Sequence, residues 1–288
     1  MKEARNPYRD RIAALTTKHG KERAIARPLR VALGLAITVE KKIDTDLLGT
    51  FTGEIERVGT PREIAIRKAR LGMKSSGLPL GLANEGSFGP HPAISWFVPS
   101  DHEMLVFIDD ELDIIVVESC LSGVTNYGYQ SAQSLGDLEC FLRQADFPSH
   151  ALVVRPNDGL RQGWVFKGVM DIDTLEEAVK RCSAASSDGL AYVGTDMRAH
   201  VNPTRRKIIR HTACRLARRL ASSCPSCGIP GWGRIQSEPG LPCEACHAPT
   251  EVIQQEIFGC ARCRYLEAKP RADGREYAEP GQCPYCNP

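Results

Sequence analysis

Eight cysteines in four Cys-x-x-Cys pairs constrain the fold of this chain more than any other feature. A Cys-x-x-Cys turn points two sulfurs at one ion, and two such turns complete a tetrahedral site with Zn–S distances of about 2.3 Å. A four-sulfur site has no open coordination position, so it is structural rather than catalytic. The sequence therefore predicts two structural zinc ions, held by Cys224, Cys227, Cys243, Cys246, Cys260, Cys263, Cys283 and Cys286.

The spacing of the pairs leaves open which of them share an ion. Fifteen residues separate the first two pairs and 19 separate the last two. Both gaps fall in the range of structural zinc sites. We expect sequential pairing, which gives two successive zinc ribbons; the alternative is an interleaved cross-brace.

Composition excludes several classes of protein. The net charge of +2 over 288 residues implies no strongly charged partner, so a nucleic-acid site has to be a local patch. No apolar run is long enough to span a membrane, and the charged N-terminus does not resemble a signal peptide. Because cysteine pairs at metal-ligand spacing are more typical of a reducing compartment than of a disulfide scaffold, we expect a cytoplasmic protein.

Strands alternate with helices over residues 11–205, which predicts an α/β layer fold. Thr60 followed by a proline, with Glu63 three residues after the cap, is a strong helix start. We expect an α/β domain over 11–220 and a double zinc-ribbon module over 221–288. Strands are expected at 12–16, 35–39, 78–83, 105–108, 114–117, 152–154 and 190–193, and helices at 21–33, from 60 onward, at 174–182 with Thr174 as its cap, and at 205–220.

Polar residues gather in four segments of the α/β domain. Residues 16–22 connect a strand to a helix, where backbone amides and the helix dipole favour a phosphate. Residues 44–68 include Asp44, Asp46, Glu54, Glu63 and Lys68, although the aspartates are equally compatible with turns and Glu63 with a capping box. Residues 84–92 follow a strand and are rich in glycine and proline, which predicts a rigid loop lining a cleft. In residues 195–205, alternate side chains share one face if the segment is extended. The candidate site residues in these segments are His19, Lys21, Asp44, Asp46, Glu63, Lys68, Glu85, Ser87, His91, Asp196, Arg198, His200 and Arg205.

Two resemblances cover most of the chain. The motifs His-Gly-Lys-Glu, Glu-Gly-Ser-Phe-Gly-Pro-His-Pro and Asp-Met-Arg-Ala-His-x-Asn-Pro-Thr-Arg, followed by paired zinc ribbons, resemble an uncharacterised bacterial family of unknown function. Residues 63–69 and 84–87 more distantly resemble the Glu-Asn-Ala-x-x-Lys-Ala helix and the Asp-Asp-Ser-Gly loop of inosine-triphosphatase-type nucleoside-triphosphate pyrophosphatases. This second resemblance implies a mixed-sheet, pyrophosphatase-like domain.

These observations lead to a hypothesis of a Mg²⁺-dependent nucleotide hydrolase with a zinc-ribbon docking module. Glu63 and Glu85 would supply carboxylates to the ion, which prefers them together with substrate phosphates. Lys21 and Lys68 would neutralise the phosphates, and His91 would serve as an acid or base. The alternative is a non-catalytic nucleic-acid-binding protein that uses the basic helix at 205–219 beside the ribbons.

Overall fold

The computed structural model describes residues 6–43, 58–92 and 95–287. The chain divides into two compact units: residues 1–109 with 117–216, and residues 110–116 with 217–288. None of the helices in the described residues has the length and apolar character that a membrane-spanning helix requires. Asp44 and Asp46 lie outside the described residues.

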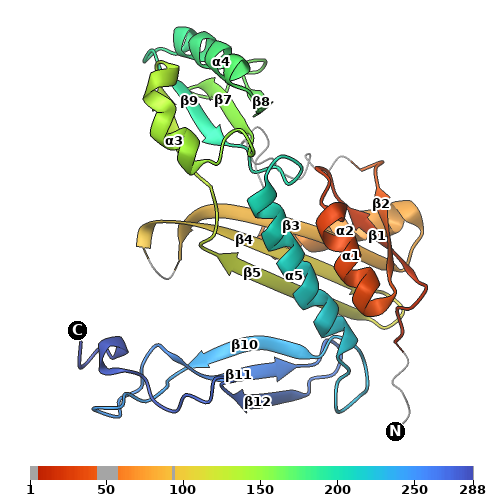
Figure 1. Cartoon of the computed structure of the whole chain (residues 1–288). Coiled ribbons are helices and arrows are strands. Elements are labelled where there is room, and N and C mark those ends of the chain that lie inside the picture. The colour runs from red at the N-terminus through yellow and green to blue at the C-terminus, as the bar shows by residue number, and fades with distance from the viewer. Residues whose placement is uncertain (1–5, 44–57, 93–94, 288) are drawn as a thin grey trace. The chain divides into compact units, whose positions relative to one another are not determined.

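A five-stranded mixed sheet with the order β2-β1-β3-β4-β5 forms the centre of the first unit, which contains all of it except residues 114–116 of β5 (Figure 1). β1 runs parallel to both β2 and β3, whereas β3 and β4 are antiparallel over almost their whole length. This confirms the prediction of an α/β fold with a mixed sheet. The strands are β1 (Ile12–Thr16), β2 (Ala36–Glu40), β3 (Leu80–His91), β4 (Ser95–Asp109) and β5 (Ile114–Ser122).

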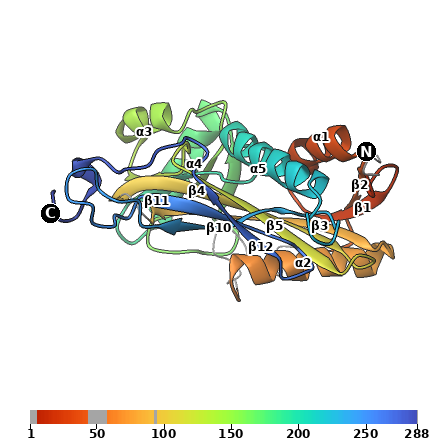
Figure 2. The same cartoon turned by 90° about the horizontal axis from the view of Figure 1, so that it is seen from below.

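Helices cover both faces of this sheet. Figure 2 shows α2 (Pro61–Ser76) on one face, and α1 (Glu22–Leu33) and α5 (Pro203–Ala221) on the other. The capping box predicted at the start of α2 is present: Glu63 donates its backbone N–H to Thr60 Oγ1, and its carboxylate accepts from the Thr60 amide at 2.8 Å. The helix therefore begins where its sequence satisfies the free backbone groups of its first turn.

A smaller antiparallel sheet with the order β6-β9-β7-β8 completes the first unit. One of its faces packs against α3 and α4 around Leu152, Val154 and Val193. The N-cap of α4 is Asp171, which accepts from the Thr174 amide at 2.8 Å, so the prediction of Thr174 as the cap is wrong. An aspartate placed before the first turn accepts more readily than a threonine inside it. The elements are β6 (Tyr129–Ala132), α3 (Glu139–Gln144), β7 (Leu152–Pro156), β8 (Phe166–Val169), α4 (Ile172–Ala185) and β9 (Ala191–Thr195).

The second unit contains one three-stranded antiparallel sheet with the order β10-β11-β12. Tight turns at both ends of these strands carry the eight paired cysteines. The strands are β10 (Gly233–Pro239), β11 (Ile253–Gly259) and β12 (Leu266–Pro270).

Residues 84–92 do not form the predicted loop, because β3 continues to His91. Its partner β4 remains in register from Leu80 opposite Asp109 to Pro90 opposite Pro99. A Cβ on Gly86 would lie 2.6 Å from both Arg205 Nη2 and Glu103 Oε1. The glycine therefore marks a close approach of side chains to a strand rather than a turn.

Candidate functional site

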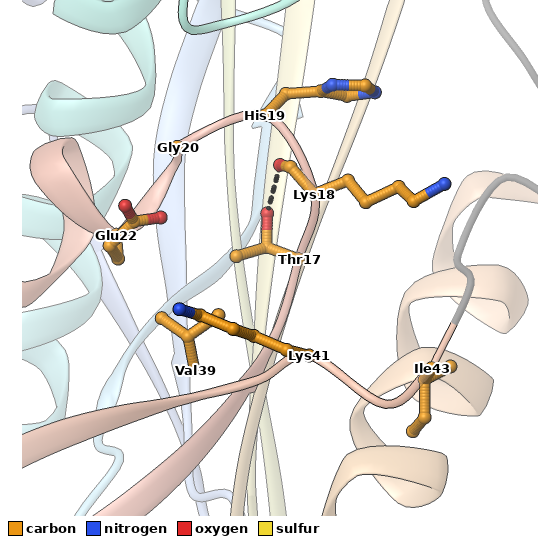
Figure 3. Close-up of a pocket in the computed structure, with 8 residues that line it drawn as sticks. All are labelled: Thr17, Lys18, His19, Gly20, Glu22, Val39, Lys41 and Ile43. Carbon is orange, nitrogen blue, oxygen red and sulfur yellow. Dashed lines mark hydrogen bonds between the residues drawn. The ribbon is translucent and has the colours of Figure 1, made fainter.

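A pocket of about 270 Å³ lies where β1 and β2 end and α1 begins (Figure 3). Its position at the carboxyl ends of parallel strands is the usual place for a ligand site in an α/β sheet. Strand β1 delivers the segment 17–20 to the pocket, and the chain leaving β2 delivers Lys41 and Ile43. The lining residues are Thr17, Lys18, His19, Gly20, Glu22, Val39, Lys41 and Ile43.

The backbone of this pocket presents several amide groups. His19 and Gly20 both have a φ of +68°, and Lys21 returns to the right-handed helical region as the N-cap of α1. A left-handed residue followed by a right-handed one turns successive N–H groups toward one concavity, which favours an anion. Within the described part of the chain, the amides of Gly20, Lys21 and Glu22 have no hydrogen-bond acceptor. The left-handed conformation of His19 is strained, as is frequent at ligand sites.

Lysines surround this turn on more than one side. Lys18 and Lys41 line the pocket, and Figure 3 shows their side chains extending from the two segments that border it. Lys21 is buried, and its ammonium donates to the carbonyl of Asn84 at 3.1 Å. Burial lowers the pKa of Lys21 to about 7, and repulsion from the positive charge of Arg205 is the second cause of the decrease. Lys21 thus supports the turn from inside the protein, while Lys18 and Lys41 supply charge to the pocket.

A buried polar network lies behind the turn, on the face of the sheet that α1 and α5 cover. Glu103 accepts from Arg205 Nε at 2.6 Å and from Asn84 Nδ2 at 2.8 Å, and both Arg205 and Glu103 are 0% exposed. Asp101 lies on the same strand face, and burial followed by repulsion from Glu103 raises its pKa to about 8. The predicted phosphate ligand Arg205 is therefore placed inside the protein, bound to Glu103 and to the carbonyl of Met197.

Glu85 and Lys68 lie on the opposite face of the sheet. Since side chains alternate along a strand, Glu85 points away from Asn84 and toward α2. There the buried carboxylate of Glu85 forms an ion pair with Lys68. The structure thus brings together two candidate catalytic residues that are 17 positions apart in the sequence.

Glu63 does not join this pair. It is exposed in the first turn of α2, where its carboxylate accepts from Thr60 and the Thr60 amide lowers its pKa. Among the described residues, no cluster of three or more metal-binding side chains contains Glu63 or Glu85. Ser87 and His91 lie farther along β3, opposite His102 and Ser95, at the end of the strand remote from β1.

The segment before α5 approaches the pocket through His200. The ring of His200 stacks on that of His19, with centroids 5.3 Å apart. Asp196 and Arg198 do not project side by side as an extended segment would require, because Arg198 folds back onto Asp196 with Nε–Oδ distances of 3.0 Å. Burial lowers the pKa of His200, and repulsion from the positive charge of Arg198 is the second cause of the decrease.

The eight cysteines form two groups that could each hold a metal ion. Cys224 and Cys263 lie 3.7 Å apart between sulfurs, and Cys227 and Cys260 lie 3.6 Å apart. In the other group, the corresponding sulfur–sulfur distances are 3.9 Å and 3.6 Å. The two groups are Cys224, Cys227, Cys260 and Cys263, and Cys243, Cys246, Cys283 and Cys286.

The preferred prediction of sequential pairing is therefore wrong, and the interleaved alternative is the one observed. The pair Cys224/Cys227 lies next to the pair Cys260/Cys263. The first pair precedes β10 in the chain and the other follows β11, and these two strands are antiparallel neighbours. Gly233 stands opposite Gly259 in this register, which places the two cysteine turns at the same end of the sheet. Two successive independent ribbons are thus replaced by one module with two interleaved sites.

The basic helix is less exposed than its composition suggests. Arg205 is buried, Arg206 donates to the carbonyls of Ala199 and His200, and Arg215 pairs with Glu118 at 3.2 Å. Arg219 donates to the carbonyl of Gly231 at 3.1 Å. At least these four of the eight basic residues predicted to form this surface therefore make contacts within the chain. Lys207, Arg210, His211 and Arg218 are the exposed ones.

The fold and the cysteine groups define an α/β protein with an interleaved two-site cysteine module. The chain belongs to the family described as Domain of unknown function (DUF6671), whose model matches residues 68–288. The match begins within α2 at Lys68, and it includes the buried pair Lys68–Glu85 and both cysteine groups, while the pocket segment 17–43 precedes it. No curated protein matches the chain significantly.

Proposed function

We propose that this protein is a nucleotide hydrolase that binds the phosphate chain of a nucleoside triphosphate in the pocket at the start of α1. The observation that carries the proposal is the turn at residues 20–22, whose amides have no acceptor within the described residues and whose Gly20 and Glu22 line a pocket together with Lys18 and Lys41. Free amides at a helix N-terminus and flanking lysines are the groups that recognise phosphate oxygens. The pocket volume of about 270 Å³ suits a phosphate chain better than a whole nucleotide.

The positions of the strand and helix that carry the distant pyrophosphatase resemblance support the proposal of a nucleotide hydrolase. Residues 63–69 lie in α2 and residues 84–87 lie in β3, and β3 pairs directly with β1, which delivers the pocket turn. The ion pair between Lys68 and Glu85 joins the two motifs. We propose that Glu85 is the acidic group of this site and that Lys68 holds its carboxylate in place.

Magnesium fits this arrangement only in part. Glu85 is a hard oxygen donor, but Lys68 already neutralises it, and Glu63 is committed to the cap of α2. Mg²⁺ commonly binds through one or two carboxylates and the substrate phosphates, so Glu85 would hold it only together with a bound nucleotide. The ion would then neutralise charge that develops on the phosphates. The protein's own contribution is to bind the phosphates at residues 18–22 and to orient Glu85.

We further propose that both cysteine groups hold zinc. Four thiolates at these sulfur–sulfur distances match a tetrahedral site with Zn–S bonds of about 2.3 Å, and zinc is the usual ion of such sites. Because each closed site leaves no position for a substrate, we assign the module to structure and docking. Because these cysteines must remain reduced to bind a metal ion, we further propose that the protein works in a reducing compartment such as the cytoplasm.

The test is a turnover screen of the full zinc-loaded chain against nucleoside triphosphates with Mg²⁺, which measures the release of phosphate and pyrophosphate. We expect turnover by the wild type and at least a tenfold loss of kcat/KM in a Lys18→Ala, Lys41→Ala variant. The matched control is Lys207→Ala, Arg210→Ala, which removes the same charge from exposed positions of α5 and should retain activity.

Two further outcomes separate the alternatives. Glu85→Gln keeps the shape of the side chain and removes its charge, so it should abolish turnover. If the wild type turns over no nucleotide but binds RNA or DNA tightly and salt-sensitively, and the control variant on α5 loses that binding, the nucleic-acid-binding alternative replaces the hydrolase.

A further inference from the structure

The sheet β6-β9-β7-β8 has a second face that its hydrophobic core does not use. Side chains alternate along a strand, and the core takes Leu152, Val154 and Val193 with α3 and α4 on one side (Figure 1). The registers place the intervening residues together on the opposite side. This aromatic face consists of Tyr129, Ser131, Val153, Arg155, Lys167, Tyr192 and Gly194.

Three of these side chains form a continuous stack. The rings of Tyr129 and Tyr192 are nearly parallel, with an interplanar angle of 22° and centroids 5.2 Å apart. The guanidinium carbon of Arg155 lies 4.1 Å from the centroid of Tyr192. Tyr129 is 62% exposed. Flat aromatic surface is thus presented to solvent at the end of an ordered stack, where a further planar group can add.

Gly194 makes this stack possible. It stands directly opposite Tyr129 in the sheet, between the two tyrosines. A Cβ on Gly194 would lie 2.8 Å from the ring of Tyr192, which is closer than carbon atoms tolerate. The missing side chain therefore lets the Tyr192 ring lie across its own strand toward Tyr129 instead of standing away from the sheet.

The charges on this face favour an anionic partner. Arg155 and Lys167 are its ionisable groups besides the tyrosines, and none of its seven positions is acidic. The nearby Asp196 is neutralised by Arg198, with an Nη2–Oδ2 distance of 2.6 Å. The acidic residues of α4, such as Asp173 and Glu177, belong to the helix that packs on the other face.

We propose that the aromatic face is a binding site for single-stranded nucleic acid, separate from the phosphate pocket. A base stacks on the exposed ring of Tyr129, and the strand's phosphates lie toward Lys167 and Arg155. Aromatic rings on a sheet surface bind bases in this way because every base has a flat π-face, and flanking cations hold the backbone. A duplex cannot bind equivalently, because its bases are already stacked on one another.

The experiment measures fluorescence anisotropy of labelled 12-nucleotide oligo(U) and oligo(dT) with the full zinc-loaded chain. Loss of one base–aromatic stack costs about 1–3 kcal/mol, so Tyr129→Ala should weaken binding roughly five- to 150-fold. Tyr129→Phe keeps the ring and should bind nearly as the wild type does. The matched control is Tyr277→Ala, which removes another exposed tyrosine, 45% accessible, from the other unit and outside the Cys-x-x-Cys turns.

The other binding results either support the nucleic-acid site on the aromatic face or overturn it. Comparison of the two oligonucleotides shows whether RNA or DNA is preferred, and either preference supports the site. Equal binding of a 12-base-pair duplex, unchanged binding by Tyr129→Ala, or no binding by the wild type at 50 mM salt would overturn the proposal. Capture of a proline-rich peptide in place of the oligonucleotides would also overturn it. Nucleotide turnover by Tyr129→Ala should match the wild type, so failure here is distinguishable from failure of the hydrolase proposal.

Discussion

Replacement of one cysteine tests the interleaved arrangement, because the two possible pairings predict that different cysteine thiols lose their metal ion and become reactive. The observed sulfur–sulfur distances of 3.6–3.9 Å compare with about 3.8 Å for the edge of a tetrahedron with 2.3 Å Zn–S bonds. Each site can contribute on the order of 10 kcal/mol of folding free energy. Cys243→Ser should therefore lower the zinc content from two ions per chain to one under mild chelation, and release the other three thiols of its own site.

The assay combines elemental analysis with thiol alkylation and peptide mass spectrometry. The interleaved sites predict that Cys246, Cys283 and Cys286 become reactive in Cys243→Ser, while Cys224 and Cys260 stay protected. Cys140→Ser is the matched control, since it removes an exposed cysteine outside both groups and should leave two ions bound. Reaction of Cys224 and Cys227 together with Cys246, with Cys283 protected, would show sequential pairing and refute the reasoning.

Three further predictions follow from buried and capping groups. Arg205→Met leaves the buried Glu103 carboxylate without its cationic partner, although Asn84 still donates to it, so the variant should be less stable by about 3–5 kcal/mol. The added Glu103→Gln should recover part of the loss, and additive losses in thermal melts would contradict the pairing. Thr60→Ala should cost about 0.5–2 kcal/mol as a lost N-cap, whereas Glu63→Gln should retain the cap, and an equal loss in both variants would count against this assignment. Because the pKa of Lys21 is lowered to about 7, the unfolded chain binds its proton more strongly, and stability should rise with pH from about 7 toward 10.5; Lys21→Met should flatten this rise in denaturant titrations, and an unchanged slope would contradict the burial of the amine.

Local features of the fold were predictable where short-range chemistry decides them. The strand at 12–16 and the capping box of Thr60 and Glu63 follow from residues within a few positions of each other, and the structure confirms both. The proline at position 61 cannot occupy a helix interior without loss of a hydrogen bond, so it also fixed the start of α2. Such signals do not depend on what the rest of the chain does.

Long-range pairing was not predictable from the same residues. The cysteine spacing satisfies both pairings, and only the antiparallel register of β10 with β11 decides between them. Gly86 reads as a turn residue in the sequence, but its function is to admit Arg205 and Glu103, and Arg205 lies 119 positions away. A glycine needed for a contact with a distant segment looks the same in sequence as one needed for a turn. The aromatic face was missed for the same reason, since Tyr129 and Tyr192 meet only in the folded sheet.

The site was predictable in part. The sequence placed a phosphate-binding turn at 16–22, and the structure has a pocket at this position, although its occupant stays a proposal. It also singled out Lys68 and Glu85, which form a buried ion pair. It did not single out Lys41 or Glu103, because neither lies in a motif and each meets its neighbours only through strand pairing.

Amide hydrogen exchange of residues 17–24 with and without a nucleoside triphosphate tests the central claim most directly. The amides of Gly20, Lys21 and Glu22 have no acceptor within the described residues, so they should exchange rapidly in the free protein. Saturating triphosphate should slow exchange in this segment, while inorganic sulfate at equal concentration should slow it less and Lys18→Ala, Lys41→Ala should reduce the effect. Unchanged exchange at residues 17–24, with protection elsewhere in the chain or nowhere, would contradict the phosphate site at the start of α1.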